Sequence, residues 1–162
     1  MTQGERGARL EGAPEPHKMI PVGGGVSVAA DMYGDCGPLV ILQHGGGQTR
    51  HAWKSAGQRL ADAGYQAVSL DARGHGDSEW APDGNYSNDV LVDDLVAVVE
   101  HFGQPPILVG ASMGGGTSLT AVGEGRVDAL ALVLVDTAPR IEVAGVRKIR
   151  DFMRQAPEGF ST

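Results

Sequence analysis

The sequence of this 162-residue chain predicts an α/β fold in which helices flank a mostly parallel sheet. Short apolar runs alternate with segments of helical periodicity from residue 38 onward. Such alternation is typical of parallel strands joined by right-handed helical crossovers. The runs are apolar at consecutive positions, as expected of strands that are buried on both faces. Sheets of this kind carry their chemistry at the carboxyl ends of the strands, so the residues after each run form the candidate site.

Each element has its own local signal. Two β-rich runs on either side of Gly23 to Gly25 predict an opening hairpin. Gly64 supplies a left-handed residue that ends the first helix, and the second helix carries Leu91, Leu95 and Val98 on one face. In chain order, the expected strands are 19–22, 26–33, 38–43, 66–70, 106–111 and 129–135, and the expected helices are 49–63, 87–102 and 113–123.

Composition and charge limit the possible functions. With 41% hydrophobic and 20% charged residues, the chain is expected to form one globular domain. Its formal net charge of −7 argues against a nucleic-acid partner. Residues 1–18 are polar, which predicts a disordered tail and neither a secretory signal nor a membrane span. The single cysteine, Cys36, suits a reducing compartment, so we expect a cytoplasmic protein.

The most informative segment runs from Pro106 to Gly116. It places Ser112 between an apolar strand and a glycine-rich helix start, with Gly110 and Gly114 in the spacing Gly-x-Ser-x-Gly. A strained turn of this type holds the hydroxyl out at the edge of the sheet, and small neighbours keep the backbone from clashing. Ser112 is therefore the predicted nucleophile. A phosphate-binding loop is the weaker interpretation, because Gly116 stands where such a loop needs lysine.

Three motifs in order carry a resemblance to a known family. The segments are His44 to Trp53 after one strand, Asp71 to Ser78 after the next, and Gly110 to Gly115 after a third. Over residues 19–153 the chain resembles the N-terminal part of an α/β-hydrolase, and in detail the epoxide-hydrolase-like hydrolases and cofactor-free haloperoxidases. The resemblance implies a hydrolase core truncated after the sixth strand. Residues 19–139 would belong to that core, and 140–162 would begin a helical cap.

The resemblance also implies a mechanism. The expected function is a serine hydrolase that cleaves ester-like or lactone-like bonds through an acyl-enzyme, with a small molecule as its substrate. Ser112 would be the nucleophile, and the backbone N–H groups of Met113 and Gly46 would form the oxyanion hole. Asp136, which ends strand 129–135, is an alternative candidate for the triad acid. No cofactor is implied, and no His/Cys/Glu cluster has metal-ligand spacing.

A base that could activate Ser112 is not evident. All five histidines precede that serine, whereas the family order is serine, acid, histidine. A packing, solvated or bracing role is expected for each: His17, His44, His51, His75 and His101. Asp71 is expected to be structural, with its carboxylate bonded to turn amides. The resemblance thus implies that the triad histidine lies beyond Thr162 and that these 162 residues alone are inactive.

Two alternatives stay open. A cofactor-free haloperoxidase or perhydrolase would use the same triad, so the motifs do not separate it from a hydrolase. A non-catalytic truncated product or binding module is favoured by the absent histidine and disfavoured by the intact nucleophile turn. The apolar strand 129–135 would lie at a sheet edge, which predicts self-association through that edge.

Overall fold

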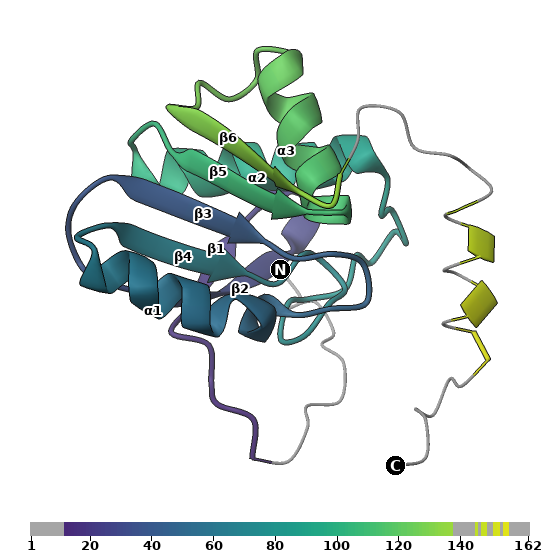
Figure 1. Ribbon diagram of the computed structural model, residues 1–162. Helices are drawn as coiled ribbons and strands as arrows, with labels where there is room; N and C mark the ends of the chain where they lie inside the picture. Colours follow the sequence, from purple (N-terminus) through teal and green to yellow (C-terminus); the bar gives the residue numbers. More distant parts are fainter. Residues whose placement is uncertain (1–11, 138–144, 146, 149–150, 153, 156–162) are drawn as a thin grey trace.

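A single six-stranded sheet is the centre of the fold in this computed structural model, which describes residues 12–137, 145, 147–148, 151–152 and 154–155 (Figure 1). The strands lie side by side in the order β1-β2-β4-β3-β5-β6. Their bounds are β1 Lys18–Pro21, β2 Ser27–Tyr33, β3 Leu39–Gln43, β4 Gln66–Leu70, β5 Ile107–Ala111 and β6 Ala131–Val135.

Pairing directions confirm the predicted topology. β1 and β2 form an antiparallel hairpin, and β2 pairs antiparallel with β4. The other four strands, β4, β3, β5 and β6, are parallel to one another. In their register Gln43 is opposite Gly110, and Ala111 is opposite Val135, so the carboxyl ends of β3, β5 and β6 meet at one edge of the sheet. The loops of the predicted motifs begin at this edge.

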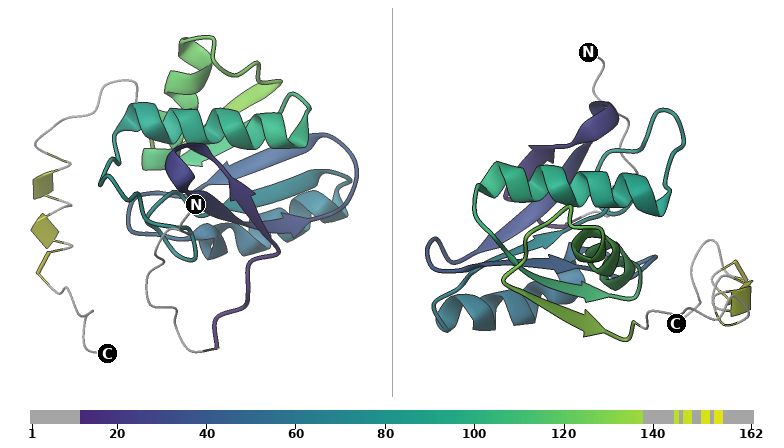
Figure 2. Two further views of the ribbon diagram at one scale, coloured as in Figure 1. Left: turned by 180° about the vertical axis from the view of Figure 1, so that it is seen from behind. Right: turned by 90° about the horizontal axis from the view of Figure 1, so that it is seen from above.

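Helices cover both faces of the sheet (Figure 2). They are the short 3₁₀ turns η1 Gly23–Gly25 and η2 Arg50–Trp53, and the helices α1 Lys54–Asp62, α2 Asn88–Phe102 and α3 Met113–Gly123. Helix α1 packs Leu60 against Val40 and Leu42 on one face. On the other face α2 buries Leu95 against strand residues such as Leu108, and α3 lies beside it. The result is a three-layer α/β arrangement with an apolar core on each side of the sheet.

Glycines end two of these helices as predicted. Gly64 follows α1 with φ of 87°, and Gly103 caps α2 with φ of 65°. Because L side chains avoid this left-handed region, glycine is the residue that a helix stop of this type favours. The first predicted helix differs at its start, since residues 50–53 form a 3₁₀ turn before α1 begins.

The N-terminal boundary differs from the sequence prediction. Lys18, which composition placed in the tail, is the first residue of β1. The ring of His17 accepts a hydrogen bond from Met32 N–H at 3.0 Å, and the carbonyl of Pro14 accepts one from Arg50 at 3.2 Å. Long-range contacts of this type order polar residues that local composition assigns to a tail. The predicted tail residues 1–11 and most of the predicted cap, 140–162, lie outside the described residues.

Strand β6 forms an edge of the sheet in the part of the chain that the structure describes. Val133 and Val135 on this strand are 46% and 42% exposed, and Leu130 just before it is 64% exposed. The register pairs Val133 with Val109 of β5. Val109 lies on the face of the sheet that α1 covers at β3 and β4. Self-association through this edge stays a prediction. Among the described helices, none combines the length and apolarity needed to cross a membrane.

Candidate active site

Ser112 lies at the turn between β5 and α3, in a conformation that L residues rarely adopt. Its φ is 44° and its ψ is −107°, and the side chain is exposed. Backbone strain of this type costs about 1–3 kcal/mol and persists where the surrounding structure imposes it. Here the Ser112 N–H donates to Val135 O at 3.1 Å, and its carbonyl accepts the N–H of Gly116 at 2.9 Å. Neighbouring strand and helix thus fix the turn that presents the hydroxyl.

The glycines around Ser112 are required by close backbone approach. A Cβ on Gly110 would lie 2.4 Å from the carbonyl oxygen of Gly114. A Cβ on Gly114 would lie 2.5 Å from Cβ of Gln43 and 2.7 Å from its carbonyl oxygen. Because real Cβ contacts stay above 3.0 Å, neither position accepts a side chain without moving backbone. The Gly-x-Ser-x-Gly spacing therefore lets the start of α3 pack directly on β3 and β5.

Two glycines in α3 give a matched test of this packing. We expect Gly114→Ala to destabilise the fold by about 1–3 kcal/mol, because the methyl group collides with β3 backbone. A Cβ on Gly116, in the same helix, meets nothing within 4 Å. Gly116→Ala should therefore raise stability by up to about 1 kcal/mol through helix propensity. Urea unfolding of the two variants measures both effects, and equal stabilities would contradict this account.

The loop after β3 lies against the serine turn. A Cβ on Gly45 would be 3.5 Å from Cβ of Ser112, and Gly114 N–H donates to His44 O at 3.1 Å. Gly45 N–H donates to Oε1 of Gln48 at 3.0 Å, and Gly47 N–H donates to Nε2 of His75 at 3.4 Å. The structure thus brings the predicted loop and the serine together.

Two backbone donors at this junction have no acceptor among the described residues. They are the N–H groups of Gly46 and Met113, the pair that sequence analysis assigned to an oxyanion hole. Met113 opens α3, where the first amides of a helix lack intrahelical partners and the dipole favours negative charge. Gly46 is exposed, with nothing within 4 Å of the position of a Cβ. Neither N–H group is therefore bonded to an acceptor in the described part of the chain.

The histidines take the roles expected of them. The ring of His17 bonds the backbone of Met32, His51 lies 3.7 Å from Asp31, and His101 packs edge-on against Phe102. The rings of His44 and His75 each bond one backbone group of their own loop and one of the other loop. In the part of the chain that the structure describes, none of the five makes a hydrogen bond to Ser112.

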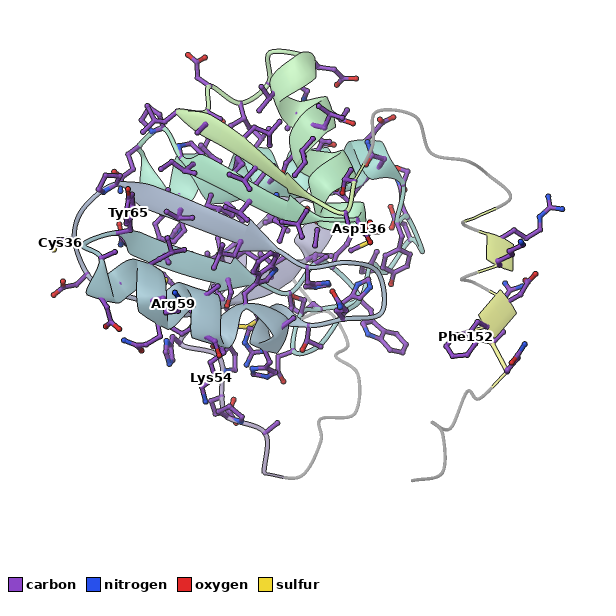
Figure 3. All side chains as sticks on the ribbon, viewed as in Figure 1. Cys36, Lys54, Arg59, Tyr65, Asp136 and Phe152 are labelled. Carbon is purple, nitrogen blue, oxygen red and sulfur yellow. The ribbon has the colours of Figure 1, made fainter. Side chains whose placement is uncertain are left out.

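Asp136 follows β6 at the same edge of the sheet (Figure 3). It is the second described non-glycine residue with positive φ, at 50°. Its neighbours touch the serine turn, since Thr137 Oγ1 donates to Ser112 O at 3.2 Å. No histidine contacts the Asp136 carboxylate among the described residues. Its assignment as a triad acid therefore stays a prediction.

A buried ion cluster beneath the loop was missed by sequence reasoning. Arg50 is 0% exposed, and its NH1 lies 2.6 Å from Asp71 and 2.7 Å from Asp77. Its Nε lies 3.0 Å from Asp31. The carboxylate of Asp71 also accepts the backbone N–H of Arg50 and, as predicted for a structural aspartate, the turn amide of Asp77. Burial lowers the pKa of Arg50, but its interactions with the three carboxylates outweigh burial and raise that pKa.

A model of the alpha/beta hydrolase fold matches residues 38–161 of the sequence. The chain belongs to the alpha/beta hydrolase family. This match confirms the family that the three motifs indicated, and the observed sheet agrees with it.

Relatives of this alpha/beta hydrolase chain include ester-cleaving enzymes. An esterase of Mycobacterium tuberculosis is 37% identical over 120 residues, covering 70% of this chain and 37% of that protein. Protein phosphatase methylesterase 1 of Bos taurus is 29% identical over 135 residues, covering 80% of this chain and 36% of that protein. The chain therefore spans little more than a third of the length of these relatives.

Solved structures show the same fold. A Vigna radiata epoxide hydrolase superposes with a TM-score of 0.71 at 26% identity, covering 82% of this chain and 45% of that one. A malate-bound esterase from Thermogutta terrifontis gives a TM-score of 0.71 at 26% identity, covering 86% and 52%. These alpha/beta hydrolases share the fold of this chain.

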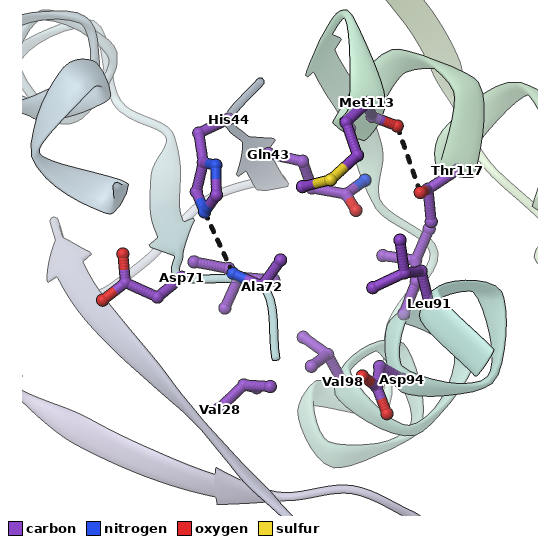
Figure 4. Close-up of a pocket in the computed structure, with 13 residues that line it drawn as sticks. Val28, Gln43, His44, Asp71, Ala72, Leu91, Asp94, Val98, Met113 and Thr117 are labelled. Carbon is purple, nitrogen blue, oxygen red and sulfur yellow. Dashed lines mark hydrogen bonds between the residues drawn. The ribbon is translucent and has the colours of Figure 1, made fainter. Parts of the chain in front are cut away.

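A small pocket of this alpha/beta hydrolase chain lies beside the start of α3 (Figure 4). Its floor is apolar, and its lining includes His44, Met113, Thr117 and Asp94. Arg73 holds Asp94 in a buried bidentate pair, at 2.6 Å and 2.5 Å. Burial raises the pKa of Asp94, and the bonds from Arg73 oppose that rise. Among the described residues, no group of three or more His, Cys, Asp or Glu side chains is arranged to hold a metal ion.

Proposed function

We propose that this chain carries the nucleophile and the oxyanion hole of a serine hydrolase that cleaves ester-like or lactone-like bonds. One observation carries the proposal. The exposed Ser112 is held in a strained turn, between a loop and a helix start whose N–H groups at Gly46 and Met113 have no acceptor among the described residues. The similarity to an esterase and a methylesterase supports the same substrate class.

The proposed reaction has two steps, acylation of Ser112 and hydrolysis of the acyl-enzyme. In the first, Oγ of Ser112 bonds to the carbonyl carbon, its proton passes to a base, and the carbonyl π electrons move to oxygen. The Gly46 and Met113 N–H groups stabilise that oxyanion. Collapse expels the alcohol, which takes up the proton, and leaves an acyl ester on Ser112. In the second step water attacks the acyl carbon, releases the acid and restores the serine hydroxyl.

Ester cleavage fits a serine nucleophile better than epoxide opening does, although epoxide hydrolases are among the structural neighbours. Attack of a hydroxyl on an epoxide carbon gives an ether, which water does not cleave under mild conditions. Attack on an ester carbonyl gives a new ester, which water does cleave. The identity of residue 112 therefore favours acyl transfer.

In this proposal none of the five histidines acts as the proton acceptor, which is supported by the lack of a hydrogen bond from any of them to Ser112 among the described residues. Nucleophile and base act as a unit, and a serine without a base retains only what the oxyanion hole and binding supply. We accordingly expect slow ester hydrolysis by these 162 residues in plain buffer.

An added base tests this proposal. Imidazole in solution should reach the exposed Ser112 and increase p-nitrophenyl acetate hydrolysis beyond the sum of the rates with imidazole alone and chain alone. This extra rate should disappear in Ser112→Ala. Ser118→Ala is the control, because Ser118 is fully buried and bonded to Gln43, away from the exposed turn. An extra rate that survives in Ser112→Ala would overturn the proposal, as would its absence from the unmodified chain.

A further inference from the structure

His44 and His75 connect the loop 44–47 to the turn 71–75. The Nδ1 atom of His44 lies 2.8 Å from Gly45 O, and its Nε2 accepts Ala72 N–H at 3.0 Å. In His75, Nδ1 lies 3.1 Å from Arg73 O, and Nε2 accepts Gly47 N–H at 3.4 Å. The two rings are 5.0 Å apart between centroids.

These partners fix the protonation state of both rings. A carbonyl oxygen only accepts, so Nδ1 carries the proton in each ring. A backbone N–H only donates, so Nε2 is bare in each ring. A proton added to either Nε2 removes the acceptor from Ala72 or Gly47 and places two positive rings side by side. The observed arrangement therefore requires two neutral imidazoles.

The loop held by these rings contains the free donor of the proposed oxyanion hole. Gly45 N–H is fixed by Gln48, and Gly47 N–H is fixed by His75. Gly46 lies between them with its N–H unpaired among the described residues. Gly47 lies in a turn with a φ of 74°, so no helix or strand hydrogen bond holds its N–H. Release of the Gly47 N–H would free the peptide between Gly46 and Gly47, which adjoins the peptide that carries the Gly46 N–H. That second peptide keeps the bond from Gln48 N–H to its carbonyl, Gly45 O, at 3.1 Å, so the Gly46 donor would be loosened through its neighbour.

The surroundings of His44 and His75 contain features that favour a protonated imidazole and features that oppose one. Asp71 and Asp94 line the same pocket as His44, and each is bonded to an arginine, Arg50 and Arg73 respectively. Asp77 and Asp31 share Arg50 with Asp71, so the cluster beside the rings carries more negative than positive charge. Carboxylates favour an imidazolium, whereas burial and the neighbouring ring disfavour one.

We propose that His75, packed against His44, is a positioning residue that holds the loop 44–47 only while both imidazoles are neutral, so that acidification releases Gly47 and loosens the Gly46 donor. Its effect on catalysis rests on the proposed function, whereas its effect on the loop does not.

Burial supports the neutral state at His44. Desolvation is the main cause that lowers the pKa of His44, with the His75 ring acting in the same direction and the Gly45 bond and Asp71 opposing. The unfolded chain, with an ordinary histidine pKa near 6.5, then takes up a proton more readily than the folded chain. Stability should therefore fall as the pH decreases below about 6.5.

Amide exchange of the isotope-labelled chain tests the proposal across a pH series. Protection of the Gly47 amide, relative to an unstructured peptide, should fall roughly 2- to 10-fold as the pH is lowered, as expected for loss of one hydrogen bond. In His75→Gln the side-chain amide oxygen accepts the Gly47 N–H at every pH, and residue 75 no longer takes up a proton. Protection of the Gly47 amide should therefore stay the same across the pH series. In His75→Ala it should be low at every pH. His101→Gln, at an exposed helix end, should behave like the unmodified chain.

Two results would overturn the proposal: Gly47 protection that stays constant while the His75 ring titrates, or His75→Ala with unmodified protection. Long-range ring correlations that place the proton on Nε2 of either histidine would also contradict it. These measurements use no substrate. They can therefore fail for the His75–Gly47 bond without bearing on the proposed hydrolase function, and the reverse also holds. If Ser112 is the nucleophile, the imidazole-dependent rate of p-nitrophenyl acetate hydrolysis can be compared across pH at a fixed concentration of neutral imidazole. As the pH is lowered, this rate should fall more in the unmodified chain than in His75→Gln.

Discussion

Replacing Arg50 by methionine is expected to lower the free energy of unfolding by about 3–5 kcal/mol, enough to unfold a marginal domain. The guanidinium is fully buried and holds Asp31, Asp71 and Asp77 together. Methionine fills a similar volume but leaves three carboxylates without their cation. Burying an unpaired charge is among the largest penalties that one substitution imposes.

A surface ion pair supplies the control. Arg126 pairs with Asp93, whose side chain is 56% exposed. Solvent screens such a pair, so Arg126→Met should cost less than about 1 kcal/mol. Urea unfolding followed by circular dichroism measures both variants. If Arg50→Met costs no more than Arg126→Met, the buried cluster does not hold the loops as described.

Removing one oxyanion donor is expected to have the largest effect on rate. Gly46→Pro deletes the free N–H, and loss of one such donor lowers rates by about 10²–10³-fold. The relevant rate is the imidazole-dependent, Ser112-dependent hydrolysis of p-nitrophenyl acetate.

Gly46→Ala is the matched variant for that experiment. It keeps the N–H, and its Cβ meets nothing within 4 Å. It should therefore react at close to the unmodified rate. Similar rates for the proline and alanine variants would exclude the Gly46 N–H from the site, and unchanged unfolding of both would confirm that folding is not the cause.

The fold was predictable because its signals are local. Consecutive apolar residues mark each parallel strand, and glycines mark the turns and helix ends. Helix α3 spans Met113–Gly123, the predicted range, since the serine turn fixes its start. Gly64 ends the first helix by adopting a positive φ, a conformation that glycine favours over other residue types, so the residue type alone indicates the helix stop.

The buried cluster was not predictable from local pattern. Arg50 has the sequence context of an exposed residue at a helix start, and its partners lie 19, 21 and 27 positions away. One signal was present, because Asp31 interrupts a strand that is otherwise apolar from Val28 to Met32. A carboxylate in a buried strand requires a cation, and this rule points to an arginine without saying which one.

Part of the candidate site was also beyond local pattern. The motifs identify Ser112 and a glycine-rich loop, but residue types do not show which of the three loop amides lacks an acceptor. That depends on the side chains of Gln48 and His75, which take the amides of Gly45 and Gly47. The link between His75 and Gly47 joins residues 28 positions apart, so only the folded chain reveals it.

The site of acylation tests the nucleophile assignment most directly. The chain would be mixed with p-nitrophenyl acetate and imidazole, quenched in acid during turnover, digested and mapped by mass spectrometry. We predict one acetyl group on Ser112, absent from the corresponding peptide of Ser112→Ala. An unmodified Ser112 peptide, with acetyl groups found only on lysines or other side chains, would contradict the assignment.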